Sequence, residues 1–131
     1  MQEVTRIDLD GVNCYLGKQD NKFVLFDTGG HIVMDKQFNN RYDALVEQLN
    51  EHGCTSENLM LIVLTPGSIA ILTANGDLIC GDTLANNKNP EMAPNAFDFG
   101  LLKKSVDRIK STGVKMVFPG HGNPFELKDL K

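Results

Sequence analysis

The feature that most constrains the fold of this 131-residue chain is a set of short apolar segments that each end abruptly in glycine, proline or polar residues. Such runs are typical of buried strands. The residues that end them are Asp27-Thr28-Gly29, Thr65-Pro66-Gly67-Ser68, Gly81-Asp82-Thr83 and Pro119-Gly120-His121-Gly122. Because α/β proteins place binding and catalytic side chains at strand ends, we expect a functional site there.

The apolar pattern also predicts how these strands are connected. Residues 4–9 alternate with a period of two, which indicates a half-buried strand, and residues 12–16 and 23–26 are predicted to form a hairpin. We interpret residues 59–64 as a second buried strand. A further hairpin is expected around Asn75-Gly76-Asp77, and residues 84–94 are predicted to form a polar loop.

Two segments have helical spacing of their apolar residues. The first stripe contains Tyr42, Leu45, Val46 and Leu49, with Asn39 or Asn40 as the expected cap and Gly53 beyond the end. The second stripe contains Phe99, Leu102, Val106 and Ile109. Strands and helices that alternate in this way predict a mixed α/β (α+β) chain.

Composition excludes several classes of partner. The formal net charge is -4 and no basic run occurs, so we expect no nucleic acid partner. The longest apolar run, residues 59–64, is too short to span a membrane, and residues 1–10 lack the apolar core of a signal peptide. The three cysteines are spaced unlike a disulfide framework or a zinc motif, so we interpret them as reduced core residues of a cytoplasmic protein: Cys14, Cys54 and Cys80.

The strand-end motifs, taken in order, resemble the metallo-β-lactamase superfamily of zinc hydrolases. The matching phrases are Val12-Asn13-Cys14-Tyr15-Leu16, Leu25-Phe26-Asp27-Thr28-Gly29, Ile62-Val63-Leu64-Thr65, Thr65-Pro66-Gly67-Ser68-Ile69, Cys80-Gly81-Asp82-Thr83-Leu84 and Pro119-Gly120-His121-Gly122. The resemblance covers nearly the whole chain. It implies a single truncated domain over residues 1–131, an αβ/βα sandwich of two small sheets with flanking helices.

The chain departs from the family where most metal ligands are expected. In the family, the strand ending in V-L-T continues directly into H-x-H-x-D-H, and a later phrase, H-T-P-G-S, supplies another ligand. Here Thr65 belongs to both phrases, the H-x-H-x-D-H motif is absent, and Leu64 occupies the place of the H-T-P-G-S histidine. The resemblance implies that Asp82 corresponds to the bridging aspartate, His121 to the last histidine ligand, and Asp27 to an aspartate that supports the site.

These residues suggest a reduced metal site. His31 follows Gly29-Gly30, and if the family fold holds, it lies at the same edge as Asp82 and His121. One zinc or another divalent metal held by these three residues is then conceivable, with Asp27 as a ligand or a support. Structural roles also fit: a turn histidine for His121, a backbone-bonding carboxylate for Asp82, and an exposed loop position for His31.

Three functions follow, in this order of preference. The first is a degenerate metallo-β-lactamase-fold, hydrolase-like protein that is not an efficient hydrolase. The second is a single-metal hydrolase of esters, thioesters or phosphodiesters that uses His31, Asp82 and His121, either within one chain or completed across a dimer. The third is a module that binds a small ligand or a protein in the emptied cleft. Relative to the family, the segment between the two phrases that share Thr65 is missing. Because its absence uncovers sheet face and a strand edge, we expect a homodimer that covers them.

Overall fold

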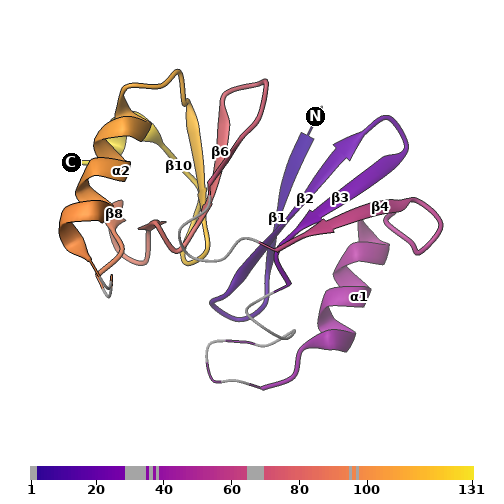
Figure 1. Cartoon of the computed structure of the whole chain (residues 1–131). Helices are drawn as coiled ribbons and strands as arrows, with labels where there is room; N and C mark the ends of the chain where they lie inside the picture. Colours follow the sequence, from indigo (N-terminus) through magenta and orange to yellow (C-terminus); the bar gives the residue numbers. More distant parts are fainter. Residues whose placement is uncertain are drawn as a thin grey trace. The chain divides into compact units, whose positions relative to one another are not determined.

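The structure is a computed structural model, and it describes residues 3–28, 35, 37, 39–64, 70–94, 96 and 98–131. The chain divides into two compact units, Met1–Leu64 and Thr65–Lys131. Among the described residues, each unit contains one four-stranded sheet and one α-helix (Figure 1). The predicted mixed α+β class with two small sheets is therefore confirmed. That the whole chain acts as one domain stays a prediction.

The sheet of the first unit has the order β1-β2-β3-β4. Its strands are β1 (Glu3–Asp8), β2 (Asn13–Gln19), β3 (Lys22–Phe26) and β4 (Leu59–Val63). The first three form an antiparallel meander, and β4 runs parallel to β3. The turns between the meander strands contain Asp10, Gly11 and Asp20 with positive φ, a conformation that glycine and aspartate tolerate better than most residues. The predicted hairpin is confirmed.

Helix α1 (Tyr42–Glu51) connects β3 to β4 and buries Leu45 and Leu49 against the first sheet. Its N-cap position is Arg41, which makes no side-chain cap bond. The predicted cap, Asn40, lies one residue earlier, and its Oδ1 accepts a bond from the Tyr42 N–H at 2.9 Å. The core between helix and sheet contains Ile7, Leu9, Cys14, Leu16, Phe23, Leu25, Leu45, Leu49 and Cys54.

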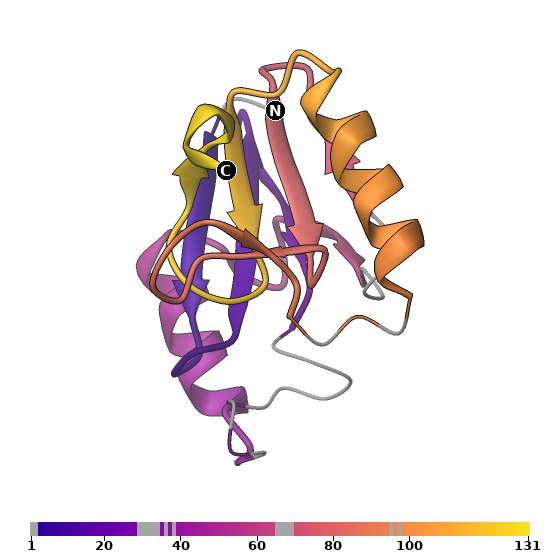
Figure 2. The ribbon, with the colours of Figure 1, turned by 90° about the vertical axis from the view of Figure 1, so that its left-hand side faces the viewer.

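The second unit has a sheet of order β10-β9-β6-β5. The strands are β5 (Ile71–Leu72), β6 (Asp77–Gly81), β9 (Met116–Pro119) and β10 (Phe125–Glu126), followed by a short 3₁₀ turn, η1 (Leu127–Asp129). β5 and β6 form the predicted hairpin, whose turn contains Gly76 with φ of 87°. β6 and β9 are parallel, as their arrowheads show in Figure 2. Their carboxyl ends therefore lie at one edge of the sheet.

Helix α2 (Phe99–Lys110) covers this sheet through its C-terminal half. Val106 and Ile109 are buried, while Phe99 is exposed, so only part of the predicted stripe packs. The core beneath the helix contains Leu78, Cys80, Leu84, Val106, Ile109, Val114, Val117, Phe125 and Leu130. All three cysteines are buried, as predicted, and none is paired in a disulfide in this structure.

Two predictions of secondary structure are wrong. The strand at residues 59–64 exists as β4, but it is not buried, because it lies at the edge of its sheet and pairs only with β3 among the described strands. Residues 84–94 are not simply a polar loop, since they contain the short hairpin β7 (Leu84–Ala85) and β8 (Glu91–Met92). Strands of two residues are too short for a periodic pattern.

No helix among the described residues has the length and apolar character needed to cross a membrane.

Candidate functional site at the ends of β6 and β9

The candidate site lies where the parallel strands β6 and β9 end. Gly81 and Pro119 are register partners at the last pair of this ladder. The Gly120 N–H donates to the Gly81 carbonyl at 2.7 Å, which holds the two strand ends together beyond the ladder. Asp82 and His121, which follow these ends closely in the sequence, are brought together for this reason.

Asp82 and His121 face each other across the strand ends. His121 Nε2 lies 3.4 Å from Asp82 Oδ1. The side chains of His121 and Asp82 are 39% and 62% exposed, so solvent reaches both. When the imidazole is protonated, this pair is an exposed ion pair, which contributes little to stability in water.

The loop after β9, which contains His121, is held in place by Asn86. Asn86 directly follows β7. The Asn86 N–H donates to the His121 carbonyl at 3.0 Å, and its Nδ2 donates to the Asn123 carbonyl at 2.9 Å. Asn86 also forms a parallel bridge with Gly122. These contacts fix the backbone around the imidazole. Asn86 was not predicted from the sequence, because nothing in a polar segment distinguishes one asparagine that holds a loop from its neighbours.

Two glycines allow the close approach of these segments. A β-carbon at position 120 would come 2.7 Å from Asp82 Oδ1 and 3.0 Å from the Gly81 carbonyl oxygen. A β-carbon at position 122 would overlap the Asn86 carbonyl, and Gly122 has a φ of 86°, a conformation that other residues rarely adopt. The two glycines of the Pro-Gly-His-Gly phrase are therefore the residues that this junction requires.

Asp27 belongs to the first unit, at the end of β3. Its φ is 64°, and its N–H donates to the Val63 carbonyl at 2.8 Å, which extends the β3–β4 pairing by one bond. Aspartate tolerates this positive φ better than most residues, as at Asp10 and Asp20. Burial raises the pKa of the nearby Cys14 thiol to about 12, and the charges of Asp27 and Asp8 add to this effect. The backbone of Asp27 thus belongs to the end of this sheet.

His31, the third predicted ligand, lies outside the described residues. The remaining histidine, His52, is the exposed C-terminal cap of α1 in the first unit. Within one unit, the structure therefore brings together two of the four predicted site residues, Asp82 and His121.

The donor set can be tested against the zinc that the fold family implies. Two ligands on one tetrahedral zinc, with bonds near 2.0–2.1 Å, are about 3.3 Å apart, which is close to the Asp82–His121 separation. Among the described residues, however, no group of three His, Cys, Asp or Glu side chains is arranged to hold a metal ion. A catalytic zinc ordinarily has three protein ligands. The described residues thus do not fit a catalytic zinc.

Comparison with solved structures shows that this chain has a metallo-β-lactamase-like fold. The solved structure of a metallo-β-lactamase family protein from Thermus thermophilus is similar over 97% of this chain and 76% of its own, with a TM-score of 0.62 and 13% sequence identity. At this identity the likeness establishes the fold alone, and it confirms the expectation from the strand-end motifs.

A second similar structure is that of the DIM-1 metallo-β-lactamase exposed to ceftazidime. It is 11% identical in sequence and covers 96% of this chain and 85% of its own, but its TM-score of 0.43 is too low to carry an argument. No family model and no curated protein sequence matches this chain.

Proposed function

We propose that this chain is a degenerate metallo-β-lactamase-fold protein that does not act as an efficient hydrolase. The observation that carries the proposal is the incomplete donor set: Asp82 and His121 lie 3.4 Å apart, and no third ligand joins them among the described residues. Affinity for zinc depends on the number of ligands and on a preformed geometry, so two exposed donors hold the ion weakly. Without a retained ion, hydroxide is not generated near neutral pH.

The test combines metal analysis with activity. Wild-type protein and the His121→Ala and His52→Ala variants are loaded with zinc and desalted, and zinc is measured by mass spectrometry. The same samples are assayed against an activated ester, a thioester and a phosphodiester. We expect wild type to retain no more zinc than His121→Ala and to show no turnover that a chelator abolishes.

A near-stoichiometric zinc content that falls in His121→Ala but not in His52→Ala would overturn this proposal. It would favour the second candidate, a single-metal hydrolase that uses His31, Asp82 and His121. The observation in its favour is that the Asp82–His121 separation matches two ligands of one ion. A His31→Ala variant then decides whether His31 completes the site, because zinc retention would fall to the level of His121→Ala.

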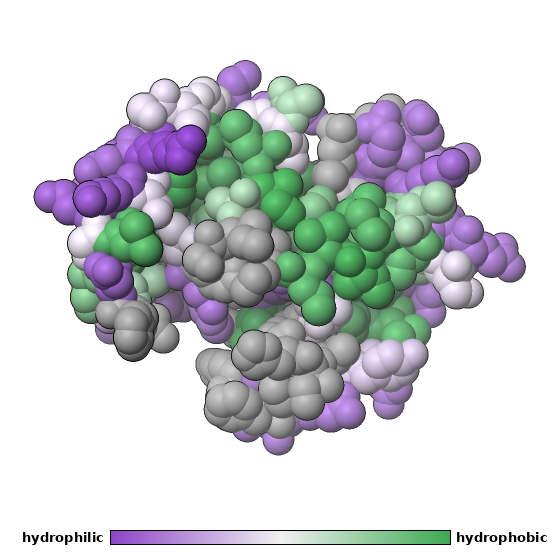
Figure 3. Space-filling model, viewed as in Figure 1, coloured by the Kyte–Doolittle hydropathy of each residue, from purple (hydrophilic) through white to green (hydrophobic). Residues whose placement is uncertain are grey.

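We also propose that two copies of the chain associate through β4. Four apolar residues of β4 and the position just after it are exposed: Met60 at 58%, Leu61 at 56%, Ile62 at 49% and Leu64 at 60%. Figure 3 shows the resulting apolar surface over β4. The other edge of the same sheet, β1, contains Glu3, Arg6 and Asp8, charges that discourage pairing with another chain. β4 has no such protection.

An antiparallel β4–β4 contact suits this edge. Such a contact brings the same surface of both copies together, and β4 contains no charge that would repel its own copy. Light scattering on wild type should give the mass of a dimer, and Leu61→Lys should give a monomer. The matched control is Tyr42→Lys, which places the same charge at an exposed residue of α1. A monomeric wild type, or a dimer unaffected by Leu61→Lys, would rule out this contact.

A further inference from the structure

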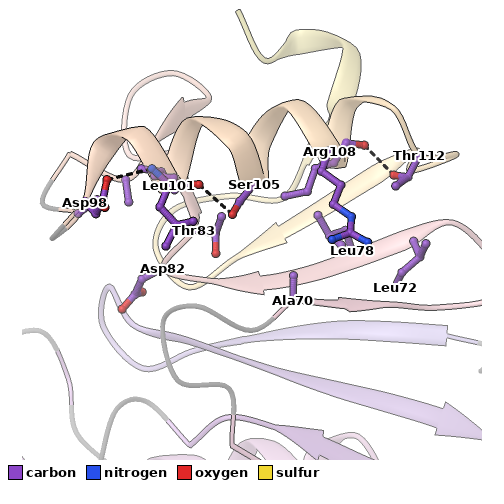
Figure 4. Close-up of a pocket in the computed structure, with 14 residues that line it drawn as sticks. Ala70, Leu72, Leu78, Asp82, Thr83, Asp98, Leu101, Ser105, Arg108 and Thr112 are labelled. Atoms are coloured by element: carbon purple, nitrogen blue, oxygen red, sulfur yellow. Dashed lines mark hydrogen bonds between the residues drawn. The ribbon is translucent and has the colours of Figure 1, made fainter.

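A groove of about 730 Å³ lies in the second unit, between α2 and the β5–β6 hairpin. Small-molecule sites commonly have volumes of this order. Figure 4 shows α2 above the groove, with Leu72 of β5 and Leu78 of β6 below it. These two leucines are register partners and so stand on one face of the sheet. The groove is distinct from the Asp82–His121 contact, although Asp82 lies at one end of it.

Most of the lining that lies along the helix and hairpin is aliphatic. The apolar residues that contribute are Leu72, Leu78, Leu101, Leu102 and Ile109, with alanines beside them. Leu72 and Leu101 are 50% and 62% exposed. A bound apolar chain would therefore remove existing apolar surface from water, which is the main source of affinity for such ligands.

The charged groups of the groove are not equivalent. Asp98 is the N-cap of α2, and its Oδ1 accepts a bond from the Leu101 N–H at 3.0 Å. Asp82 lies beside His121. The Arg108 guanidinium, in contrast, makes no ion pair or side-chain hydrogen bond within the described part of the chain. Figure 4 shows it reaching from α2 toward Leu78, away from both carboxylates.

The hydroxyl groups near Arg108 do not compete with it for a ligand. Ser105 Oγ donates to the Leu101 carbonyl at 3.1 Å, and Thr112 Oγ1 donates to the Ile109 carbonyl at 2.6 Å. Both hydroxyl protons thus bond to backbone carbonyls of α2. Arg108 is the donor that remains for a ligand at this end of the groove, and a guanidinium binds a carboxylate through two parallel N–H bonds.

We propose that the groove binds a small amphipathic carboxylate, with its carboxylate on Arg108 and its alkyl chain against Leu72, Leu78 and Leu101. The ligand class follows from one uncompensated cation beside an aliphatic surface. Arg108 is exposed to solvent, so a neutral apolar molecule would gain nothing from its charge, and a cation would meet it with the same charge. This inference does not depend on whether the Asp82–His121 pair holds a metal.

The test measures binding of decanoate, 1-decanol and decyltrimethylammonium by isothermal titration calorimetry, with the two ions below their micellar concentrations and the alcohol below its solubility limit. We expect decanoate to bind wild type at least tenfold more tightly than either other ligand. This comparison needs no variant. Equal binding of decanol and decanoate, tighter binding of the cation, or no binding of decanoate would overturn the proposal.

Variants then locate the contact. Arg108→Gln should weaken decanoate binding at least tenfold, while Lys104→Gln should leave it unchanged, because Lys104 is an exposed cation of the same helix that does not line the groove. Arg108→Lys keeps the charge but loses the paired N–H geometry, so an intermediate affinity is expected. Equal effects of the two glutamine substitutions would show that only the net charge of the protein matters, and would also overturn the proposal.

Discussion

Gly122 packs against the backbone of Asn86 so closely that any side chain would overlap the Asn86 carbonyl. The contact joins the loop after β9 to the segment before the β7–β8 turn, and it sets the position of His121. Two segments separated by more than thirty residues are thereby fixed to each other. The geometry of the candidate site depends on this backbone contact as much as on the two side chains that face each other.

A series of glycine substitutions tests this contact. Gly122→Ala should reduce the free energy of unfolding by about 2 kcal/mol or more, because the positive φ and the overlap both oppose a side chain. Gly53→Ala has the positive φ but open space, and should cost about 1 kcal/mol. Gly113→Ala has open space and no unusual φ, so little change is expected. Urea denaturation gives all three values, and equal costs at positions 53 and 122 would show that the overlap relaxes.

The N-cap of α2 gives a second prediction. Asp98→Ala removes the acceptor of the Leu101 N–H and should lower the free energy of unfolding by about 1 kcal/mol. Asp107→Ala removes the same charge from an exposed position within the helix and should cost clearly less. Thermal denaturation followed by circular dichroism compares the two. A loss at position 107 as large as at position 98 would point to net charge rather than capping.

Two leucines of the second unit that differ in burial should differ in how much they contribute to the free energy of unfolding. Leu84 is fully buried in the core beneath α2, so Leu84→Ala should cost about 2–5 kcal/mol. Leu101 of α2 is 62% exposed, and Leu101→Ala should change stability by about 0.5 kcal/mol or less. Denaturant titration of both variants checks this difference, and a small effect at Leu84 would contradict the described core.

The buried thiols predict a dependence of stability on alkaline pH. Burial raises the pKa of Cys80 from 9.0 to about 12, so the folded state holds the thiol proton more firmly than the unfolded state does. The resulting stabilisation is complete below pH 9 and is lost as pH rises from 9 toward 12.

Because lysines and tyrosines titrate in the same range, the measurement is a difference between variants. The decline in stability over this window should be shallower in Cys80→Ala than in wild type, and Cys14→Ala should behave similarly, since its thiol pKa is also raised to about 12. Parallel declines in wild type and both variants would show that these thiols ionise in the folded state as they do in the unfolded chain.

Sequence patterns predicted the elements whose signals are local. The hairpin of β2 and β3, the Gly76 turn and the two helices each depend on residues within a few positions of one another, and all are present. The strand-end motifs also predicted the fold, and Asp82 and His121 were correctly identified as residues at the ends of β6 and β9. Their mutual distance required the parallel pairing of those strands.

What the sequence alone determined is therefore the order of the longer strands and the two helices, the residues at their ends, and the absence of an H-x-H-x-D-H phrase. The tertiary structure decided that β4 is an exposed edge, that Asn86 holds the loop that contains His121, and that Arg108 lies over an aliphatic groove. The physical reason is the separation along the chain of the residues that produce each feature. Periodicity and turn preference arise from neighbouring residues, whereas burial and unpaired charge depend on which distant segments pack together.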